Sequence, residues 1–272
     1  MPEIAEVRVV AKTLKRQLIG KKIEKVQILV ANIIDEDIKN FVANIQGKKI
    51  EDITTYGKWI IFNMGQVSLL SHLRMEGKYF YVPSNSEITK HDHVIFSLDN
   101  NYDLRYNDVR KFGKMFTTDT DKIFEDERIK KLGYEPDDKR LTSTYLLDKL
   151  KDKSIPIKEA LLDQTIINGL GNIYANEVLF ASKINPFKKS SNITSDEASV
   201  IIKNACKIVT KSFEMGGTTI KSYTSSLGVI GHYQDELKVQ SKENKPCSVC
   251  NSPIKRVKLN GRSIFYCEKC QK

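Results

Sequence analysis

The chain has 272 residues, 40% of them hydrophobic, and its 44 Lys and Arg against 34 Asp and Glu give a net charge of +10. That length can bury a core in one large domain or two moderate ones, and the positive charge indicates a polyanionic partner, most simply nucleic acid, unless the protein is merely basic. No apolar run approaches the roughly 20 residues of a membrane span, and the charged N-terminus lacks the apolar core of a signal peptide. We therefore expect a cytoplasmic protein with no membrane partner.

The chain opens with Met1-Pro2-Glu3-Ile4-Ala5-Glu6. A proline after the initiator allows removal of Met1, which would leave a free secondary amine. An α-amino group titrates near ~7.7–8, so much of it is neutral at physiological pH and able to attack a sugar carbon as an imine-forming nucleophile. Apolar residues at helical spacing predict a helix directly afterwards, with Gly20 as its stop signal. Ordinary helix capping by proline and glutamate in a first turn explains the same residues.

Short β-rich runs dominate as far as about residue 118, apart from a helical segment near Asp35–Ile45. The expected strands are Lys22–Val30, Lys48–Thr54, Trp59–Met64, Val67–Leu73, Lys78–Val82, Val94–Leu98, Tyr102–Tyr106 and Lys114–Thr117. Many short strands separated by turn residues indicate a sandwich or barrel.

A highly charged stretch between Asp119 and Arg140 predicts a hinge. Helical patterns follow at Thr142–Lys151, Pro156–Gln164, Asn172–Ser182 and Ser195–Met215, and then a glycine- and serine-rich loop, Gly216–Gly231. Strands first and helices afterwards argue for two domains of different class, an α+β organisation.

Turns in the strand-rich half carry several conspicuous side chains. Lys58 follows a glycine and opens an apolar strand, so its amine either enters a cleft or lies solvated at a strand edge. Met75, three residues after His72, either projects from a turn or packs in the core. His91-Asp92-His93 lacks an evident third metal ligand, which favours a hydrogen-bonded or phosphate-contacting histidine. In Asp108-Val109-Arg110-Lys111-Phe112-Gly113 an arginine can pair with a phosphate or base edge, and the phenylalanine can wedge between bases.

The second half contains a turn and a cysteine motif. Asn172, after Gly169-Leu170-Gly171, is expected to cap a helix whose N-terminal amides could face a phosphate. Cys247-x2-Cys250-x16-Cys267-x2-Cys270 has the spacing of a closed structural zinc site, and its four filled positions disfavour a catalytic zinc. The hairpin between the pairs is basic and contains no acid, which suits a nucleic-acid backbone, and Arg262 is expected near its tip.

Together these pieces resemble the formamidopyrimidine-DNA glycosylases, bacterial enzymes that excise oxidised purines. The matching pieces are Pro2-Glu3 with Glu6, Gly57-Lys58, His72-x2-Met75, His91-Asp92-His93, Asp108-x-Arg110-Lys111-Phe112-Gly113, Lys153 ahead of Pro156-Ile157-Lys158, Gly169-x-Gly171-Asn172-Ile173-Tyr174, and the four cysteines with Arg262. Their joint order is highly specific, although only the cysteine spacing is specific by itself. Ala5 departs from the proline usual in the family, at a position that carries no chemistry.

The resemblance implies a fold and a set of partners. The fold is an N-terminal β-sandwich with flanking helices (1–132), a helix-two-turn-helix domain (133–234) with a lesion-capping loop (216–231), and a β-hairpin zinc finger (235–272), with DNA in the cleft between the domains. The partners are one structural Zn²⁺, no organic cofactor, and duplex DNA with oxidised purines opposite cytosine. No sequence feature indicates an oligomer, so a monomer associated with the bacterial nucleoid is expected.

The resemblance also implies residue roles. The Pro2 amine attacks the sugar C1′ and forms a Schiff base, Glu3 handles protons at the sugar ring oxygen, and Lys58 and Arg262 assist the β,δ-eliminations. The remaining contacts to DNA fall to Glu6, to the backbone-contacting His72, His91, Lys153 and Asn172, and to the gap-filling Met75, Arg110 and Phe112. The loop residues that would recognise the lesion are Thr218, Thr219, Ile220, Lys221, Ser222 and Tyr223.

Two alternatives remain at this point. An endonuclease VIII-like enzyme would share the proline chemistry but prefer oxidised pyrimidines; Met75, the Arg110-Lys111-Phe112 segment and the long loop before Gly231 favour the purine enzymes. A non-catalytic zinc-ribbon protein that binds DNA would explain the charge and the cysteines but not Pro2-Glu3.

Overall fold

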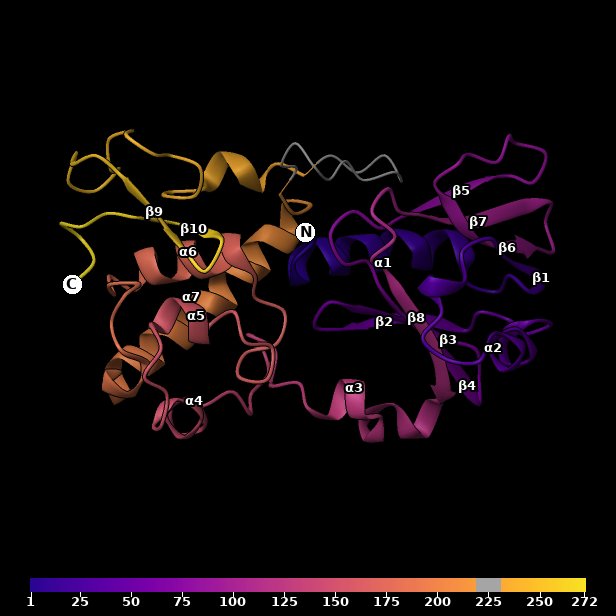
Figure 1. The fold of residues 1–272 in the computed structure, drawn as a ribbon, viewed down its shortest axis with the longest axis horizontal. Helices are drawn as coiled ribbons and strands as arrows, with labels where there is room; N and C mark the ends of the chain where they lie inside the picture. The colour runs from indigo at the N-terminus through magenta and orange to yellow at the C-terminus, as the bar shows by residue number, and fades with distance from the viewer. Residues whose placement is uncertain (219–230) are drawn as a thin grey trace. The chain divides into compact units, whose positions relative to one another are not determined.

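The computed structural model describes residues 1–218 and 231–272. The chain divides into two compact units, Met1–Lys130 with Gly216–Gly231, and Lys131–Met215 with His232–Lys272. Figure 1 draws the strand-rich part of the first unit in indigo and magenta, and the helices and hairpin of the second in colours from pink through orange to yellow. The α+β class expected from the order of the sequence patterns is confirmed.

The first unit begins with helix α1 (Ile4–Leu18) and contains two four-stranded antiparallel sheets. One sheet has the order β1 (Ile23–Ile28), β6 (Asp92–Leu98), β7 (Tyr102–Asn107), β5 (Lys78–Pro83). The other has the order β2 (Asp52–Tyr56), β3 (Trp59–Asn63), β4 (Val67–His72), β8 (Lys114–Asp119). Short helical segments accompany them: η1 (Ala31–Ile33), α2 (Ile38–Ile45), η2 (Thr120–Glu125) and α3 (Glu127–Lys130).

One hydrophobic core joins α1 to both sheets. It includes Leu14 of α1, Phe62 of β3 and Phe96 of β6, all at most 1% exposed. The alternating and apolar runs of the sequence therefore bury one face of each sheet, as the sandwich prediction required.

The expected strand at Lys48–Thr54 is wrong at its beginning. Lys49 forms only an isolated bridge with Lys22, and β2 starts at Asp52. The backbone of Ile50 instead pairs with the chain just after α1, since it accepts from Gly20 N–H at 2.9 Å and donates to the Lys21 carbonyl at 2.9 Å. The backbone N–H and C=O of Ile50 are therefore bonded to Lys21 and Gly20 and not to the sheet, a tertiary contact that no local sequence pattern reveals.

The second unit is helical and ends in a hairpin. Its elements are α4 (Ser143–Leu150), α5 (Ile157–Ala160), α6 (Asn172–Ala181), η3 (Ser190–Asn192), α7 (Ser195–Glu214), η4 (Tyr233–Glu236), β9 (Lys255–Leu259) and β10 (Arg262–Tyr266). Helix α5 is shorter than the expected Pro156–Gln164, because Leu162 and Asp163 donate to carbonyls three residues back and tighten the turn. Within the two described ranges, no helix has the length and apolarity to cross a bilayer.

Candidate functional site

Two buried glutamates cap the start of α1. Glu3 is the N-cap; its N–H donates to Glu6 Oε2 at 2.9 Å, and the Glu6 N–H donates to the Glu3 carboxylate in return. This is a capping box, so the capping interpretation of the sequence is confirmed as geometry. The two residues are nevertheless only 2% and 6% exposed. Burying a carboxylate costs free energy that a surface Ser or Thr cap would avoid, so capping alone does not explain two acids here.

The second oxygen of Glu6 reaches the beginning of the long loop. Glu6 Oε1 accepts from Thr218 N at 2.8 Å and from Thr218 Oγ1 at 2.9 Å. Gly217 has a φ of +80°, and a Cβ there would lie 3.0 Å from Glu6 Oε1. Glycine at this position therefore permits both the left-handed turn and the close approach of the carboxylate.

Lys58 lies in the two-residue turn between β2 and β3, where Tyr56 pairs with Trp59. Gly57 has a φ of +57° in this turn, a conformation that glycine adopts without a steric penalty. Lys58 is only 5% exposed, so the solvated alternative is wrong and the lysine points inward. A buried ammonium needs compensating charge.

The N-terminus lies among these charges. Burial lowers the pKa of the Met1 amine below its ordinary value, Glu3 and Glu6 oppose that shift, and Lys58 adds to it. Pro2 is buried beneath the exposed Met1. Removal of Met1 would carry the terminal amine one residue further into the cluster formed by Glu3, Glu6 and Lys58, where a neutral, nucleophilic nitrogen is favoured by burial.

A tight turn after β4 exposes Met75. Arg74, with a φ of 53°, donates its N–H to His72 Nδ1 at 3.0 Å, and Gly77 N–H closes the turn on the Leu73 carbonyl at 3.0 Å. Met75 is 36% exposed, so its alternative placement in the core is wrong. Because Nδ1 of His72 accepts a hydrogen bond, its Nε2 carries the proton of the neutral ring and can donate to a phosphate oxygen.

Asp108 shapes the loop that carries Arg110 and Phe112. The Asp108 side chain is fully buried; its Oδ1 accepts from Arg110 N at 3.0 Å, and its Oδ2 accepts from Phe112 N and Gly113 N, both at 2.9 Å. The loop therefore projects the Phe112 ring, which is 50% exposed, with the Arg110 guanidinium 4.6 Å from the ring centroid. An apolar wedge and a cation are presented together on a rigid support.

Tyr106 holds the Met75 turn and the Asp108 loop together, a role that sequence reasoning missed. A Cβ added at Gly77 would lie 2.2 Å from the Tyr106 hydroxyl oxygen, and one at Gly113 would lie 1.7 Å from it. The hydroxyl also donates to Asp108 Oδ2 at 3.3 Å, and Tyr106 is fully buried. The two glycines in these turns are the sequence signal that could have indicated a side chain packed against both.

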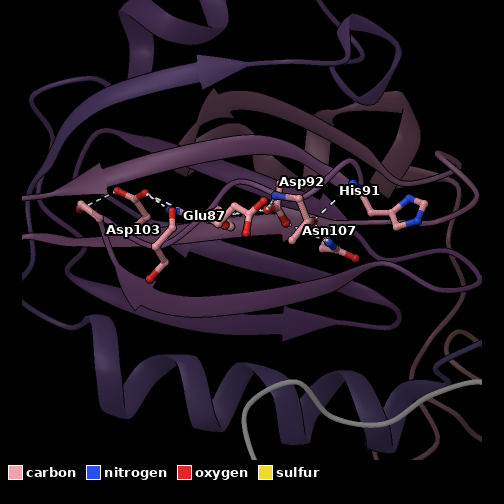
Figure 2. Close-up of polar contacts among 9 residues, drawn as sticks. Glu87, His91, Asp92, Asp103 and Asn107 are labelled. Carbon is pink, nitrogen blue, oxygen red and sulfur yellow. Dashed lines mark hydrogen bonds and ion pairs between the residues drawn. The ribbon is translucent and has the colours of Figure 1, made fainter.

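Of the two histidines around Asp92, His93 is hydrogen-bonded through its ring, one of the alternatives expected from the sequence, whereas His91 joins the network through its backbone. His93 is 1% exposed, and its Nε2 lies 2.7 Å from the Asp108 carbonyl. His91 stands at the end of the chain of polar contacts in Figure 2, beside Asn107. Among the residues that the structure describes, only the four terminal cysteines form a group that could hold a metal ion.

In the second unit, Asn172 is not the helix cap expected from the sequence. Gly171 is the N-cap and Asn172 is the first residue of α6. The Asn172 side chain is occupied elsewhere, since its Nδ2 donates to the Ser263 carbonyl of β10 at 3.0 Å. The fully buried Lys158 donates from Nζ to the Asn172 carbonyl at 2.8 Å. Lys158 is a second residue that sequence reasoning assigned no role.

The turn before α6 and the tip of the hairpin share a small cavity. Asn172 and Arg262 line this space of about 10 Å³ together with Lys158 and Ile264. Asn260 Nδ2 donates to the Glu159 carboxylate, which ties the hairpin turn to α5. Arg262 opens β10 directly after that turn, as predicted. Lys153 is partly exposed and lies 3.6 Å from Asp163 Oδ2.

The four cysteines meet the requirements of a zinc site. Their Sγ atoms all lie within 4.8 Å of one another, with Cys247–Cys270 at 3.9 Å and Cys250–Cys267 at 3.4 Å. A zinc ion with four Zn–S bonds of about 2.3 Å separates its sulfurs by roughly 3.8 Å in a tetrahedron. The site therefore fits one structural zinc, which braces the hairpin β9–β10 against Phe180 and Val239 in the same core cluster.

The loop residues fall into two groups. Thr218 contacts Glu6, as given above. Thr219, Ile220, Lys221, Ser222 and Tyr223 lie outside the described residues.

Comparisons with known proteins cover the whole chain. Residues 1–115 match the family model of the formamidopyrimidine-DNA glycosylase N-terminal domain, residues 132–224 that of its H2TH domain, and residues 244–272 a zinc finger found in FPG and IleRS. A formamidopyrimidine-DNA glycosylase of Listeria monocytogenes serotype 4b is 41% identical over 273 residues, covering 100% of both chains. One from Lactobacillus helveticus is 40% identical, covering 100% of this chain and 99% of the relative.

Solved structures agree with the sequence comparisons. The Lactococcus lactis Fpg in complex with DNA containing an abasic site has a TM-score of 0.92 and 34% identity, with 99% of each chain covered. A mutant of that protein in complex with Fapy-dG-containing DNA has a TM-score of 0.93 and 33% identity, with 100% of each chain covered.

Proposed function

Because the chain belongs to the formamidopyrimidine-DNA glycosylase family, we propose that it excises oxidised purines from duplex DNA and then cleaves the strand as an AP lyase. The observation that carries this proposal is the buried cluster of Glu3, Glu6 and Lys58 around the N-terminus. Helix capping by Glu3 and Glu6 does not require both acids to be buried, nor a buried lysine beside the terminal amine, whereas perturbed ionisable groups of this kind are typical of catalytic sites.

Chemistry would begin once Met1 has been removed. The Pro2 nitrogen attacks C1′ of the damaged nucleotide, the bond from C1′ to the base breaks, and the base leaves with a proton. Glu3 supplies a proton to the sugar ring oxygen as the ring opens to the iminium ion. Lys58 and Arg262 then assist the proton transfers of the β- and δ-eliminations and hold the adjacent phosphates. Glu6 keeps the N-terminal turn and Thr218 in place through its two oxygens.

The flipped base must leave the duplex, at a cost of a few kcal/mol, and the gap must be filled. We propose that Met75, Arg110 and Phe112 fill this gap in the duplex. Tyr106 and Asp108 hold the turns that carry them. We assign phosphate contacts to His72, His91, Lys153 and Asn172, which fix the DNA without reading its sequence. The loop residues from Thr218 to Tyr223 would face the extruded base.

The remaining features follow from DNA as the substrate. Zinc bound by the four cysteines stabilises the basic hairpin, which would contact the DNA backbone. The domains proposed from the sequence are residues 1–132, 133–234 and 235–272, and a monomer in the bacterial cytoplasm, close to the nucleoid, would suffice for the reaction. Preference for oxidised purines opposite cytosine is supported by the Arg110–Phe112 loop and by the Fapy-dG complex of the similar Lactococcus lactis protein.

Borohydride trapping tests the covalent chemistry. Protein whose mass shows loss of Met1 should become attached to duplex DNA containing 8-oxoguanine opposite cytosine when borohydride reduces the imine. Pro2→Gly should trap poorly, whereas Pro83→Gly, at an exposed proline far along the chain, should trap like the wild type. Absence of an adduct from correctly trimmed wild-type protein would leave only a zinc protein that binds DNA.

Substrate comparison separates the two enzyme classes. Under the same conditions, 8-oxoguanine opposite cytosine should be excised faster than thymine glycol. A preference for thymine glycol would instead assign the chain to oxidised pyrimidines.

A further inference from the structure

A buried ion-pair network lies beneath the loop between β5 and β6. Arg105 of β7 is 2% exposed, and its neighbours Asp92 and Asp103 are 5% and 4% exposed. Arg105 donates to Asp103 Oδ2 from Nε at 3.2 Å and from Nη2 at 3.0 Å, and its Nη1 lies 3.9 Å from Asp92 Oδ2. Figure 2 shows Asp103 at one end of this row of side chains and His91 at the other.

Arg105 also holds the backbone of the loop. Its Nη1 donates to the Glu87 carbonyl at 2.8 Å, and its Nη2 donates to the Ser86 carbonyl at 2.9 Å. Residues 84–91 form no helix or strand, and most of them are exposed. Two backbone bonds hold the start of this segment, from Ser84 N to the Asn101 carbonyl at 3.0 Å and from Ser86 N to the Pro83 carbonyl at 2.9 Å. The Arg105 contacts order it further, because each one satisfies a backbone carbonyl.

The network continues from Asp92 to His91. Asp92 Oδ2 accepts from Thr89 N at 2.8 Å, and Asp92 Oδ1 accepts from Asn107 Nδ2 at 2.9 Å. Thr89 Oγ1 in turn lies 3.4 Å from the N–H of His91 and 3.3 Å from Asn107 Nδ2. The His91 carbonyl accepts from Asp108 N at 3.0 Å. The backbone of His91 is therefore held from both sides.

Stability alone is a weak reason for this arrangement. A buried ion pair loses the hydration of its charges, and apolar residues of similar volume often stabilise a fold equally well. Multidentate bonds from a planar guanidinium to two carbonyls and a carboxylate instead fix a shape, since each bond has a preferred direction. Through Asp92 and Thr89 these contacts extend to the backbone of His91.

We propose that Arg105 is a positioning residue, which acts through the Asp92–Thr89–Asn107 contacts to hold His91 where it meets a DNA phosphate. This inference rests on the phosphate contact assigned to His91 under the proposed function. With the loop pre-ordered, binding of DNA does not have to immobilise it, and that ordering cost would otherwise weaken affinity.

Fluorescence anisotropy with duplex DNA carrying a tetrahydrofuran abasic analogue tests the inference. His91→Ala should raise Kd on the order of tenfold, as expected for loss of one hydrogen bond to a charged group. Arg105→Lys keeps the charge but loses the several directed donors of the guanidinium, and it should raise Kd severalfold. Asn107→Ala should raise Kd to a smaller extent. Ser84→Ala removes a 2.8 Å hydrogen bond to Asp103 at the opposite end of the network and should leave Kd unchanged.

Combination with His91→Ala distinguishes positioning from a general loss of structure. In that background, Arg105→Lys and Asn107→Ala should raise Kd no further. Asn107→Ala keeps the test decisive should Arg105→Lys fail to fold.

Two results would overturn the inference in distinguishable ways. If His91→Ala weakens binding but the other two variants are silent or act additively with it, His91 contacts DNA without help from Arg105. If His91→Ala has no effect, the phosphate contact assigned under the proposed function fails and the inference fails with it.

Discussion

Glu6 Oε1 lies 2.8 Å from Thr218 N, across 212 positions of sequence. Its other oxygen accepts from the backbone of Glu3 at 2.9 Å. A single buried carboxylate thus fixes both the N-terminal turn, where the nucleophile is proposed, and the first residue of the segment proposed to face the base. The N-terminal turn and the start of that segment cannot move independently while these bonds persist.

Glu6→Gln should therefore destabilise the protein and slow excision together. The amide keeps the volume, but its NH₂ group faces donors where an oxygen accepted, which costs about 1–3 kcal/mol for the buried N–H left without a partner. Thr218→Val should cost about 0.5–1.5 kcal/mol, because the backbone bond remains. Thr218→Ser, which keeps the hydroxyl, should behave as the wild type in denaturant unfolding and excision assays; equal losses in the Ser and Val variants would contradict the bond's importance.

Gly113→Ala should impair gap filling. The new methyl group would lie 1.7 Å from the Tyr106 hydroxyl oxygen and 2.5 Å from its Cζ, so the loop bearing Arg110 and Phe112 must shift. We expect excision opposite cytosine to fall roughly 10- to 100-fold, the loss that a displacement of about 1 Å causes. Gly47→Ala is the control: no atom lies within 4 Å of its added Cβ, although its φ of +81° adds a backbone strain that Gly113 does not have. An undiminished rate in Gly113→Ala would show that Tyr106 does not fix the loop.

His72 should make folding sensitive to acid. Burial, followed by the nearby charges of Arg74 and Lys58, lowers the pKa of His72 to about 3, whereas the unfolded chain has a histidine pKa of about 6.5. Between these values the unfolded state binds a proton that the folded state does not. The free energy of unfolding therefore falls as the pH drops below about 6.5, by up to about 1.4 kcal/mol per unit, and is independent of this group at higher pH.

Urea unfolding at several pH values checks the His72 prediction. His72→Asn keeps an acceptor for the Arg74 N–H. In this variant the free energy of unfolding should fall less steeply below pH 6.5 than in the wild type. If the free energy of unfolding falls equally steeply with acid in both proteins, the pKa of His72 is not lowered in the folded state. The neutral ring also implies that the His72 contribution to DNA affinity stays constant from pH 5.5 to 8.

Loss of zinc should unfold the hairpin and weaken DNA binding. Cys250→Ser removes one thiolate of the four, and Cys247 and Cys267 belong to a core cluster with Phe180 and Ile254. Metal analysis should find about one zinc per wild-type chain and far less in the variant, with a lower melting temperature, because a structural zinc contributes directly to folding. Cys206→Ser, a cysteine of α7 outside the site, should change neither value; retention of full zinc by Cys250→Ser would contradict the assignment.

Local sequence patterns predicted the elements well where the residues interact with near neighbours. Strand periodicity located the sheet strands of the first unit, apart from the beginning of β2, and the cysteine spacing located the zinc ligands, because both depend on short-range geometry. The assignment of Asn172 as a helix cap was wrong because its side chain reaches Ser263, 91 positions away. The burial of Lys58 was equally undetermined, since a turn lysine faces inward or outward according to what surrounds it.

Tertiary networks were beyond the sequence for the same reason. Tyr106, Arg105 and Asp103 read as ordinary alternating positions of a strand. Tyr106 packs against the Met75 turn and the Asp108 loop only because the fold brings these two turns together. Likewise, only the fold of residues 84–91 brings backbone carbonyls to the Arg105 guanidinium.

The two ends of the long loop, at Gly217 and Gly231, lie against each other. A Cβ on Gly231 would lie 2.2 Å from the Gly217 carbonyl oxygen and 2.7 Å from that of Gly216. The backbones of the two segments are therefore in contact, with no room for a side chain at Gly231. Changes confined to residues 219–230 leave the Gly217–Gly231 contact and the Glu6–Thr218 bonds in place, and lengthening a closed loop adds little entropic penalty. With the lesion-recognition role proposed for residues 219–223, substitutions there can change which damaged base is accepted, while the buried residues around the N-terminus stay the same.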